Sequence, residues 1–202
     1  MDPFVKQVAE AMAARGFEVA FAERAAQARE IALAMIQPGQ SVGIGGSMTI
    51  RELGLADALA RQGHSVYWHW DAPGEQTLEQ ARQADVYLAS ANAVTRDGCI
   101  VNIDGRGNRV ASLLQGPATV ILIVGQQKLV DGGLNTAIAR IRQQACPPNA
   151  KRLGLDTPCA HTGICNARAC GEDCMCRAIT MLEHPTRGRR VAVILVEETI
   201  GY

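Results

Sequence analysis

Short apolar segments alternate with amphipathic helical segments along most of this chain. Residues 41–45, 86–89 and 118–124 have the composition of buried strands, and a glycine-rich or polar turn follows each of them. Residues 49–63 and 134–145 carry apolar side chains at helical spacing. Strands that alternate with helices in this way predict an α/β fold, with a mostly parallel sheet and flanking helices.

The N-terminal part of the chain is expected to be helical. Asp2 followed by Pro3 is a typical helix start, because the aspartate caps the first turn and the proline fits the first helical position. This helix is expected to end at Gly16, and a second one to cover residues 22–36. The remaining expected elements are strands at residues 65–70, 99–103 and 190–196 and a polar helix at 74–83.

The charge composition limits the partners of the protein. Its 202 residues include 20 basic and 20 acidic side chains, so the formal net charge is zero. A protein that binds mainly nucleic acid needs a concentrated positive face, so nucleic acid is not an expected partner. The longest apolar runs, residues 118–125 and 191–196, are far shorter than the roughly 18 residues of a membrane-spanning helix. Residues 1–10 also lack the apolar block of a signal peptide, so we expect a cytoplasmic protein without a membrane span.

A glycine-rich turn joins the strand at residues 41–45 to the next helix. Gly45 and Gly46 allow the backbone to approach a ligand closely, and Ser47 and Thr49 add hydroxyl groups. The start of a helix presents unpaired N–H groups and the positive end of the helix dipole, which suit an anion. The alternative is a tight turn without a ligand, in which Thr49 begins a capping box. Neither of the glycine motifs typical of nucleotide binding is present.

Polar side chains also follow the other expected strands. Open α/β sheets bind ligands at the carboxyl ends of their strands, so these side chains are candidates for the lining of one pocket. The candidates are Ser90, Asn92, Asp104, Asn108 and Lys128. The alternative is ordinary turn chemistry for the asparagines and the aspartate, and an exposed position for the lysine.

Five of the seven cysteines lie in one short stretch with the spacing C-x5-C-x4-C-x3-C-x-C. In a reducing cytosol such a group is more often a metal site than a disulfide framework. Thiolates favour zinc or iron–sulfur clusters, and His161 is a substitute ligand for zinc. Reduced thiols without a metal, or a disulfide, are the alternatives. Cys99 and Cys146 stand apart and are expected to be small buried apolar residues.

Several segments of the chain resemble the lactate-utilisation (LUD) domain family, in its short, cysteine-containing branch. These segments are residues 43–54, 88–98, 102–109 with Gly116-Pro117, 158–165 and 197–202. The resemblance extends over nearly the whole chain. One departure from the family pattern is Gln127, which stands before Lys128 in place of an asparagine.

This resemblance implies a fold similar to that of ribose-5-phosphate isomerase and the CoA transferases. Residues 1–202 are then one domain, and residues 147–177 are a cysteine-rich, metal-binding excursion within it. Proteins of that fold bind phosphorylated sugars or acyl-CoA thioesters beside a glycine-rich turn. The resemblance also implies a [4Fe–4S] cluster, with zinc as the alternative, and leaves Cys174 as the spare thiol. The implied metal ligands are Cys159, Cys165, Cys170 and Cys176.

Two functions follow from these observations. Members of the family are associated with the oxidation of L-lactate to pyruvate alongside iron–sulfur partner proteins, which implies a ligand-binding or accessory subunit that takes a small anionic ligand. The alternative is a stand-alone enzyme acting on a phosphorylated sugar or a CoA-linked substrate, with a structural zinc. No catalytic nucleophile is assigned, because the chain shows neither a Ser-His-Asp arrangement nor a glutamate in a transferase motif. The oligomeric state is left open, with a homo-oligomer among the alternatives.

Overall fold

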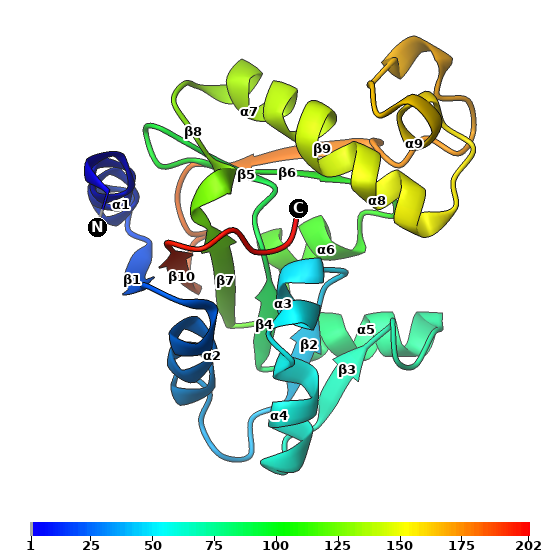
Figure 1. Ribbon diagram of the computed structural model, residues 1–202. Helices are drawn as coiled ribbons and strands as arrows, with labels where there is room; N and C mark the ends of the chain where they lie inside the picture. Colours follow the sequence, from blue (N-terminus) through cyan, green and yellow to red (C-terminus); the bar gives the residue numbers. More distant parts are fainter. Residues whose placement is uncertain (1) are drawn as a thin grey trace.

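The computed structural model describes residues 2–202 and contains, within them, a parallel sheet of six strands in the order β1-β10-β7-β4-β2-β3 (Figure 1). These strands are β1 (Glu18–Ala22), β2 (Val42–Ile44), β3 (Val66–Trp68), β4 (Val86–Ala89), β7 (Thr119–Gly125) and β10 (Arg190–Val196). The pairing of β4 with both β2 and β7 confirms that the first three predicted strands are neighbours. Met1, which belongs to the segment expected to lack a targeting signal, lies outside the described residues.

Helices cover both faces of this sheet. One face packs against α1 (Pro3–Ala14), α5 (Glu75–Gln83) and α6 (Asn108–Leu114). The opposite face packs against α2 (Ala25–Ala34), α3 (Met48–Glu52) and α4 (Leu55–Arg61). A strand covered on both faces is apolar along its whole length, which explains the composition of β7 and β10. The structure therefore confirms the predicted fold class.

Two helical predictions near the N-terminus need correction. The edge strand β1 at residues 18–22 was not predicted, and the helix predicted over residues 22–36 corresponds to α2, which begins at Ala25. Ala22 pairs with Val196 of β10 and so belongs to the strand rather than to the helix. The helix predicted over residues 49–63 is divided in two at Gly54, whose φ of 59° lies in the left-handed region. The start of α1 is as predicted, because the Asp2 side chain accepts hydrogen bonds from the first-turn amides.

A second sheet, with four strands within the described residues, was not expected from the sequence. Its order is β8 (Leu129–Val130), β5 (Ala93–Thr95), β6 (Ile100–Asp104) and β9 (Ala178–Leu182). The predicted strand at residues 99–103 belongs to this sheet rather than to the parallel one. In Figure 1 the second sheet lies above the carboxyl edge of the parallel sheet and below the long helical segment of residues 134–153.

That helical segment is longer than predicted. α7 (Leu134–Arg140) continues through a wider turn, Ile141–Ala145, into α8 (Cys146–Leu153). Arg140, on this helix, is buried although it is charged, and its Nη1 donates to the Asn92 carbonyl at 2.9 Å. The cysteine-rich segment that follows contains only short helical turns, α9 (Pro158–Thr162) and Ala167–Ala169. Among residues 2–202, no helix is long and apolar enough to cross a membrane.

Candidate functional site

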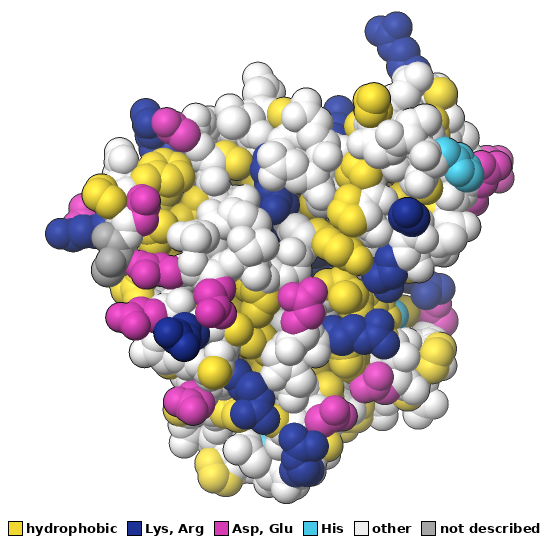
Figure 2. Space-filling model, in the orientation of Figure 1, with side chains coloured by type: hydrophobic (Ala, Val, Ile, Leu, Met, Phe, Trp, Pro, Cys, Tyr) yellow, Lys and Arg dark blue, Asp and Glu magenta, His cyan; other side chains and the backbone are white. Residues whose placement is uncertain are grey.

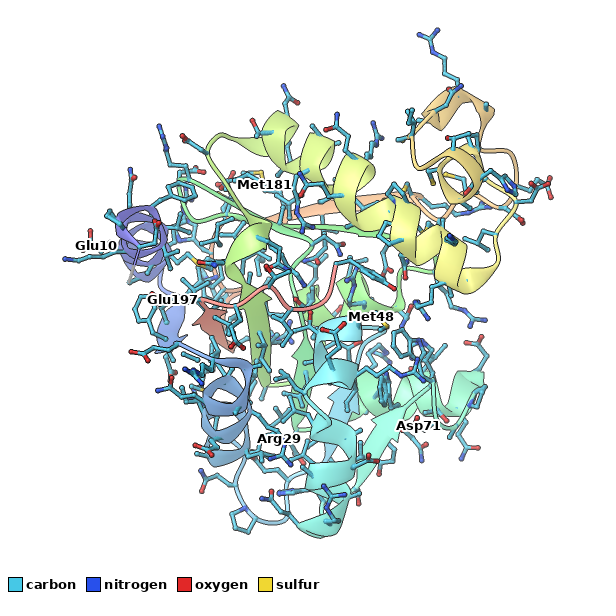
Figure 3. The ribbon with its side chains drawn as sticks, in the orientation of Figure 1. Glu10, Arg29, Met48, Asp71, Met181 and Glu197 are labelled. Carbon is cyan, nitrogen blue, oxygen red and sulfur yellow. The ribbon has the colours of Figure 1, made fainter. Side chains whose placement is uncertain are left out.

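Polar loops meet at the carboxyl edge of the parallel sheet around a cavity of about 260 Å³. The predicted ligand-binding residues that line it are Gly46, Ser47, Thr49, Ser90, Asn92, Asp104, Asn108 and Lys128. Gly45, which was also predicted to bind the ligand, is not among the lining residues. Met48, labelled in Figure 3, marks the start of α3 beside this cavity. The structure thus brings together residues that lie on separate loops in the sequence.

Lys128 is the most deeply placed cation of the cavity. It ends a short helical turn, Gln126–Lys128, directly after β7, and its side chain is fully enclosed. Its Nζ donates hydrogen bonds to Thr49 Oγ1 at 2.8 Å and to Ser90 Oγ at 3.0 Å. Both partners are neutral hydroxyl groups. Burial, reinforced by the nearby charges of Arg140 and Arg109, lowers the pKa of Lys128 to about 7.

Arg109 forms a second cationic group of the cavity wall. Its Nη2 donates to Asn92 Oδ1 at 2.9 Å and to the Ile103 carbonyl at 2.8 Å. Its Nε is buried and has no hydrogen-bond partner among the described residues. Buried donors are nearly always paired in folded proteins, so this N–H is an unsatisfied donor within the cavity wall.

Asp104 and Asn92 hold the arginine in place. Asp104 Oδ2 accepts the backbone N–H groups of Arg109 and Val110, at 3.1 and 3.2 Å, and so caps the start of α6. Asn92 Oδ1 also accepts the backbone N–H of Ile103 at 3.0 Å. Part of the turn-chemistry interpretation is therefore correct for both residues. Both side chains make hydrogen bonds to the backbone.

The predicted capping box at Thr49 is wrong. The helix cap is Ser47, whose Oγ accepts the N–H of Ile50 at 3.3 Å, while Thr49 lies inside α3 and turns toward Lys128. Gly45 has a packing role. A Cβ added there would lie 3.0 Å from the Tyr87 hydroxyl and 3.1 Å from Arg109 Cγ. The absence of a side chain at Gly45 thus leaves room for the Arg109 side chain in the cavity wall.

The C-terminal residues close one side of the site. Gln127 Nε2 donates to the Ile200 carbonyl at 2.9 Å, and the Gly201 N–H donates to Glu52 at 2.8 Å. A Cβ on Gly201 would lie 2.3 Å from Thr49 Oγ1 and 3.2 Å from Lys128 Nζ. The residues after β10 therefore pack directly over the buried lysine. Gln127, which departs from the family pattern, holds them there through its hydrogen bond to Ile200.

The opposite wall contains residues that the sequence reasoning did not select. Trp70 stacks on Trp68 at 5.2 Å between ring centroids and lies under the guanidinium of Arg152 at 4.6 Å. Trp70 and Arg152 both line the cavity. They come from segments without any motif, so the sequence held no signal for their position. Tyr202, in the C-terminal segment that resembles the family, lines the cavity as well. On the face shown in Figure 2, basic and acidic side chains are interspersed rather than gathered in one basic surface.

Two cysteines also reach the cavity. Cys146, at the start of α8, and Cys176, before β9, line it with their sulfur atoms 3.3 Å apart. The hydrogen bond between Cys146 and Cys176 lowers the pKa of Cys176 to about 7, and the same contact raises the pKa of Cys146. Cys146 was expected to be an isolated buried residue; it is buried, but it has a thiol partner.

The predicted metal ligands lie in one region of the structure, but their side chains are not arranged as a metal-binding group. Cys165 is close enough to Cys159, Cys174 and Cys176 for their charges to raise its pKa, although burial contributes more. Within the described residues, no three His, Cys, Asp or Glu side chains are arranged so that they would hold a metal ion. His161 pairs with Asp156 at 2.7 Å. Cys99 is buried near Asp97, away from this group.

Comparison with known proteins agrees with the fold. A DUF162 family protein from Deinococcus radiodurans, solved by crystallography, superimposes with a TM-score of 0.57 at 18% sequence identity, over 96% of each chain. At this identity the similarity concerns the fold alone. No curated protein matches the chain. The model of the LUD domain matches residues 5–196, which is nearly the whole sequence. The chain therefore belongs to the LUD-domain family, the family of lactate utilisation.

Proposed function

We propose that this protein is the anion-binding subunit of a cytoplasmic system that oxidises L-lactate to pyruvate, acting alongside iron–sulfur partner proteins. The cavity would bind a small molecule that carries a carboxylate or a phosphate group. Membership of the LUD-domain family supports the pathway, and the charge balance of the cavity supports the class of ligand.

That charge balance is the observation that carries the proposal. Lys128, Arg109 and Arg140 are all buried around the cavity. Among the lining side chains that the structure describes, Asp104 is the one carboxylate; it caps α6 and pairs with Arg109 at 3.9 Å, so it is the one acidic side chain of the lining for three buried cations. Buried cations in excess of their counterions are costly. An anionic ligand would offset this cost and would supply an acceptor for the unpaired Nε of Arg109.

Binding can be followed through tryptophan fluorescence, because the chain has two tryptophans and one of them, Trp70, lines the cavity. We expect lactate, pyruvate or inorganic phosphate to change the emission in a saturable manner. Arg109→Gln should weaken the binding about tenfold or more, since a hydrogen bond to a charged group contributes about 1.5–3 kcal/mol.

The matched control is Arg190→Gln. Arg190 pairs with Glu18 at the amino end of β10, at the opposite edge of the sheet from the cavity. Thermal unfolding of both variants checks that each is folded. Equal affinity in the wild-type protein and Arg109→Gln, or no binding of any of these anions, would contradict the proposal.

The cysteine-rich segment is proposed to carry an iron–sulfur cluster. The chemistry of the donor set fits, because it consists of thiols, and Cys170 interacts electrostatically with Cys174, Cys159 and Cys165. The residues that would hold the cluster are Cys159, Cys165, Cys170 and Cys176. When bound, such a cluster supplies one-electron transfer. Zinc at the same thiols, together with binding of a CoA ester or a sugar phosphate, would instead support the stand-alone enzyme.

A further inference from the structure

We infer that Lys128 is a covalent binding site, whose amine forms an imine with the carbonyl carbon of a 2-oxo carboxylate held in the cavity. This inference rests on the proposed function for the binding of the carboxylate group. It adds the class of substrate and the protein atom that reacts with it.

The environment of Lys128 favours a nucleophile over a fixed charge. Its side chain is 2% exposed, yet its hydrogen-bond partners are the hydroxyl groups of Thr49 and Ser90 rather than a carboxylate. Buried lysines that serve only as charges are normally paired with an acidic group. A lysine that is desolvated beside other cations keeps a neutral, nucleophilic amine near neutral pH. Lys128 lines the cavity, so a ligand bound there would lie beside it.

The cavity also has a place for the acidic group of the substrate. Arg109 lies close enough to Lys128 for the two charges to interact, and its Nε has no hydrogen-bond partner among residues 2–202. A carboxylate bound to this arginine would place the adjacent carbonyl carbon toward the lysine. A 2-oxo carboxylate carries these two groups on neighbouring atoms, which is why this class fits better than a simple anion.

The reaction requires no oxidant or reductant. The lone pair of Nζ attacks the carbonyl carbon, and the electron pair of the C=O bond moves to oxygen, which takes a proton. Nitrogen loses two protons in all, oxygen takes the second of them as the C–O bond breaks, and water leaves as the C=N bond forms. The balance is one amine and one ketone to one imine and one water. Ser90 Oγ donates its own proton to the Ile123 carbonyl at 2.6 Å, so its lone pair accepts the hydrogen bond from Nζ and positions the amine.

The sequence makes a sharp test available, because the chain has only three lysines, Lys6, Lys128 and Lys151. The full-length protein is incubated with pyruvate and sodium borohydride, and the intact mass and the modified peptide are determined by mass spectrometry. L-lactate is the matched ligand control, since it carries the same carboxylate but has no carbonyl. The double variant Lys6→Arg/Lys151→Arg keeps Lys128 as the sole lysine, and both replaced residues are exposed.

We expect one reduced pyruvate adduct, on Lys128, in the wild-type protein and in the double variant. We expect complete loss of the adduct in Lys128→Met and no adduct with lactate. Saturable binding of pyruvate by fluorescence, without an adduct on Lys128, would overturn this inference and leave the proposed function in place. Adducts confined to Lys6, Lys151 or the N-terminal amine would overturn it as well. Absence of both binding and adduct would overturn the proposed function together with this inference.

Discussion

Lys128 determines the acid–base behaviour of the cavity, because it is enclosed among two arginines and two hydroxyl groups. Its pKa in the folded protein is about 7, well below the ordinary value of 10.5, and the charge of Glu52 opposes this shift only in part. The unfolded chain therefore binds more protons than the folded protein at pH values between these two pKa values. Burial of the charged form of this side chain therefore lowers the free energy of unfolding.

The sign of the pH dependence follows from this difference. Stability contributed by Lys128 should rise as the pH increases from about 7 to about 10, because unfolding then requires uptake of a proton. Below about pH 7 both states are protonated, and the full cost of burying the charge remains. Urea denaturation of the wild-type protein and Lys128→Met across this range is the measurement, and the difference between the two proteins should shrink or reverse as the pH rises. A difference that does not change with pH would contradict the lowered pKa.

At the scale of elements, close contact between β2 and α5 sets the position of the glycine-rich turn. Gly43 lies in the middle of β2, and a Cβ added there would lie 2.2 Å from the Ala81 carbonyl oxygen in α5. Backbone atoms cannot move away as a flexible side chain can. The glycine of this strand is therefore required by packing, whereas the glycines that follow it serve the cavity.

Gly43→Ala is expected to destabilise the protein by about 3 kcal/mol or more, because helix α5 must shift away from the sheet. Gly46→Ala is the matched control, since its added Cβ would make an ordinary 3.4 Å contact with the Trp70 ring. The free energies of unfolding from denaturant titrations provide the comparison. Equal stability of the two variants would show that α5 is not held as closely as the structure indicates.

At the scale of the whole molecule, the cysteine-rich segment is separate from the two cores of the parallel sheet. Neither core contains a residue from positions 147–177 among its buried members. Cys176 and Met175 pack only against the smaller core under α7 and α8. The segment has few apolar residues of its own, so a bound metal would supply much of its order.

Loss of one ligand should therefore unfold this segment and leave the sheet intact. In protein prepared without oxygen, Cys165→Ser should lose stoichiometric metal and become sensitive to protease within residues 147–177. Cys174→Ser should change both properties much less, because Cys174 is not one of the four implied ligands and all four remain. Iron with sulfide in the wild-type protein would support the cluster, and zinc the alternative. Full metal retention in both variants would show that the ligand set is different.

The sequence by itself determined the central strands of the parallel sheet, their neighbouring order and a polar part of the cavity lining. Apolar strands and the polar residues that follow them are local features, and the rule that ligands bind at carboxyl strand ends places Thr49, Ser90 and Lys128 together. These features survive in the structure because both faces of the sheet must be covered for the apolar strands to be buried.

Only the tertiary structure decided how the second sheet completes the site. The Cys146–Cys176 contact, the burial of Arg140 and the packing of Gly201 on Thr49 each join segments that are distant along the chain. Such contacts have no local period or motif, since they depend on where whole elements settle against one another. The same reason explains why Lys128 could be placed in the cavity from the sequence, while its enclosure and its lowered pKa could not.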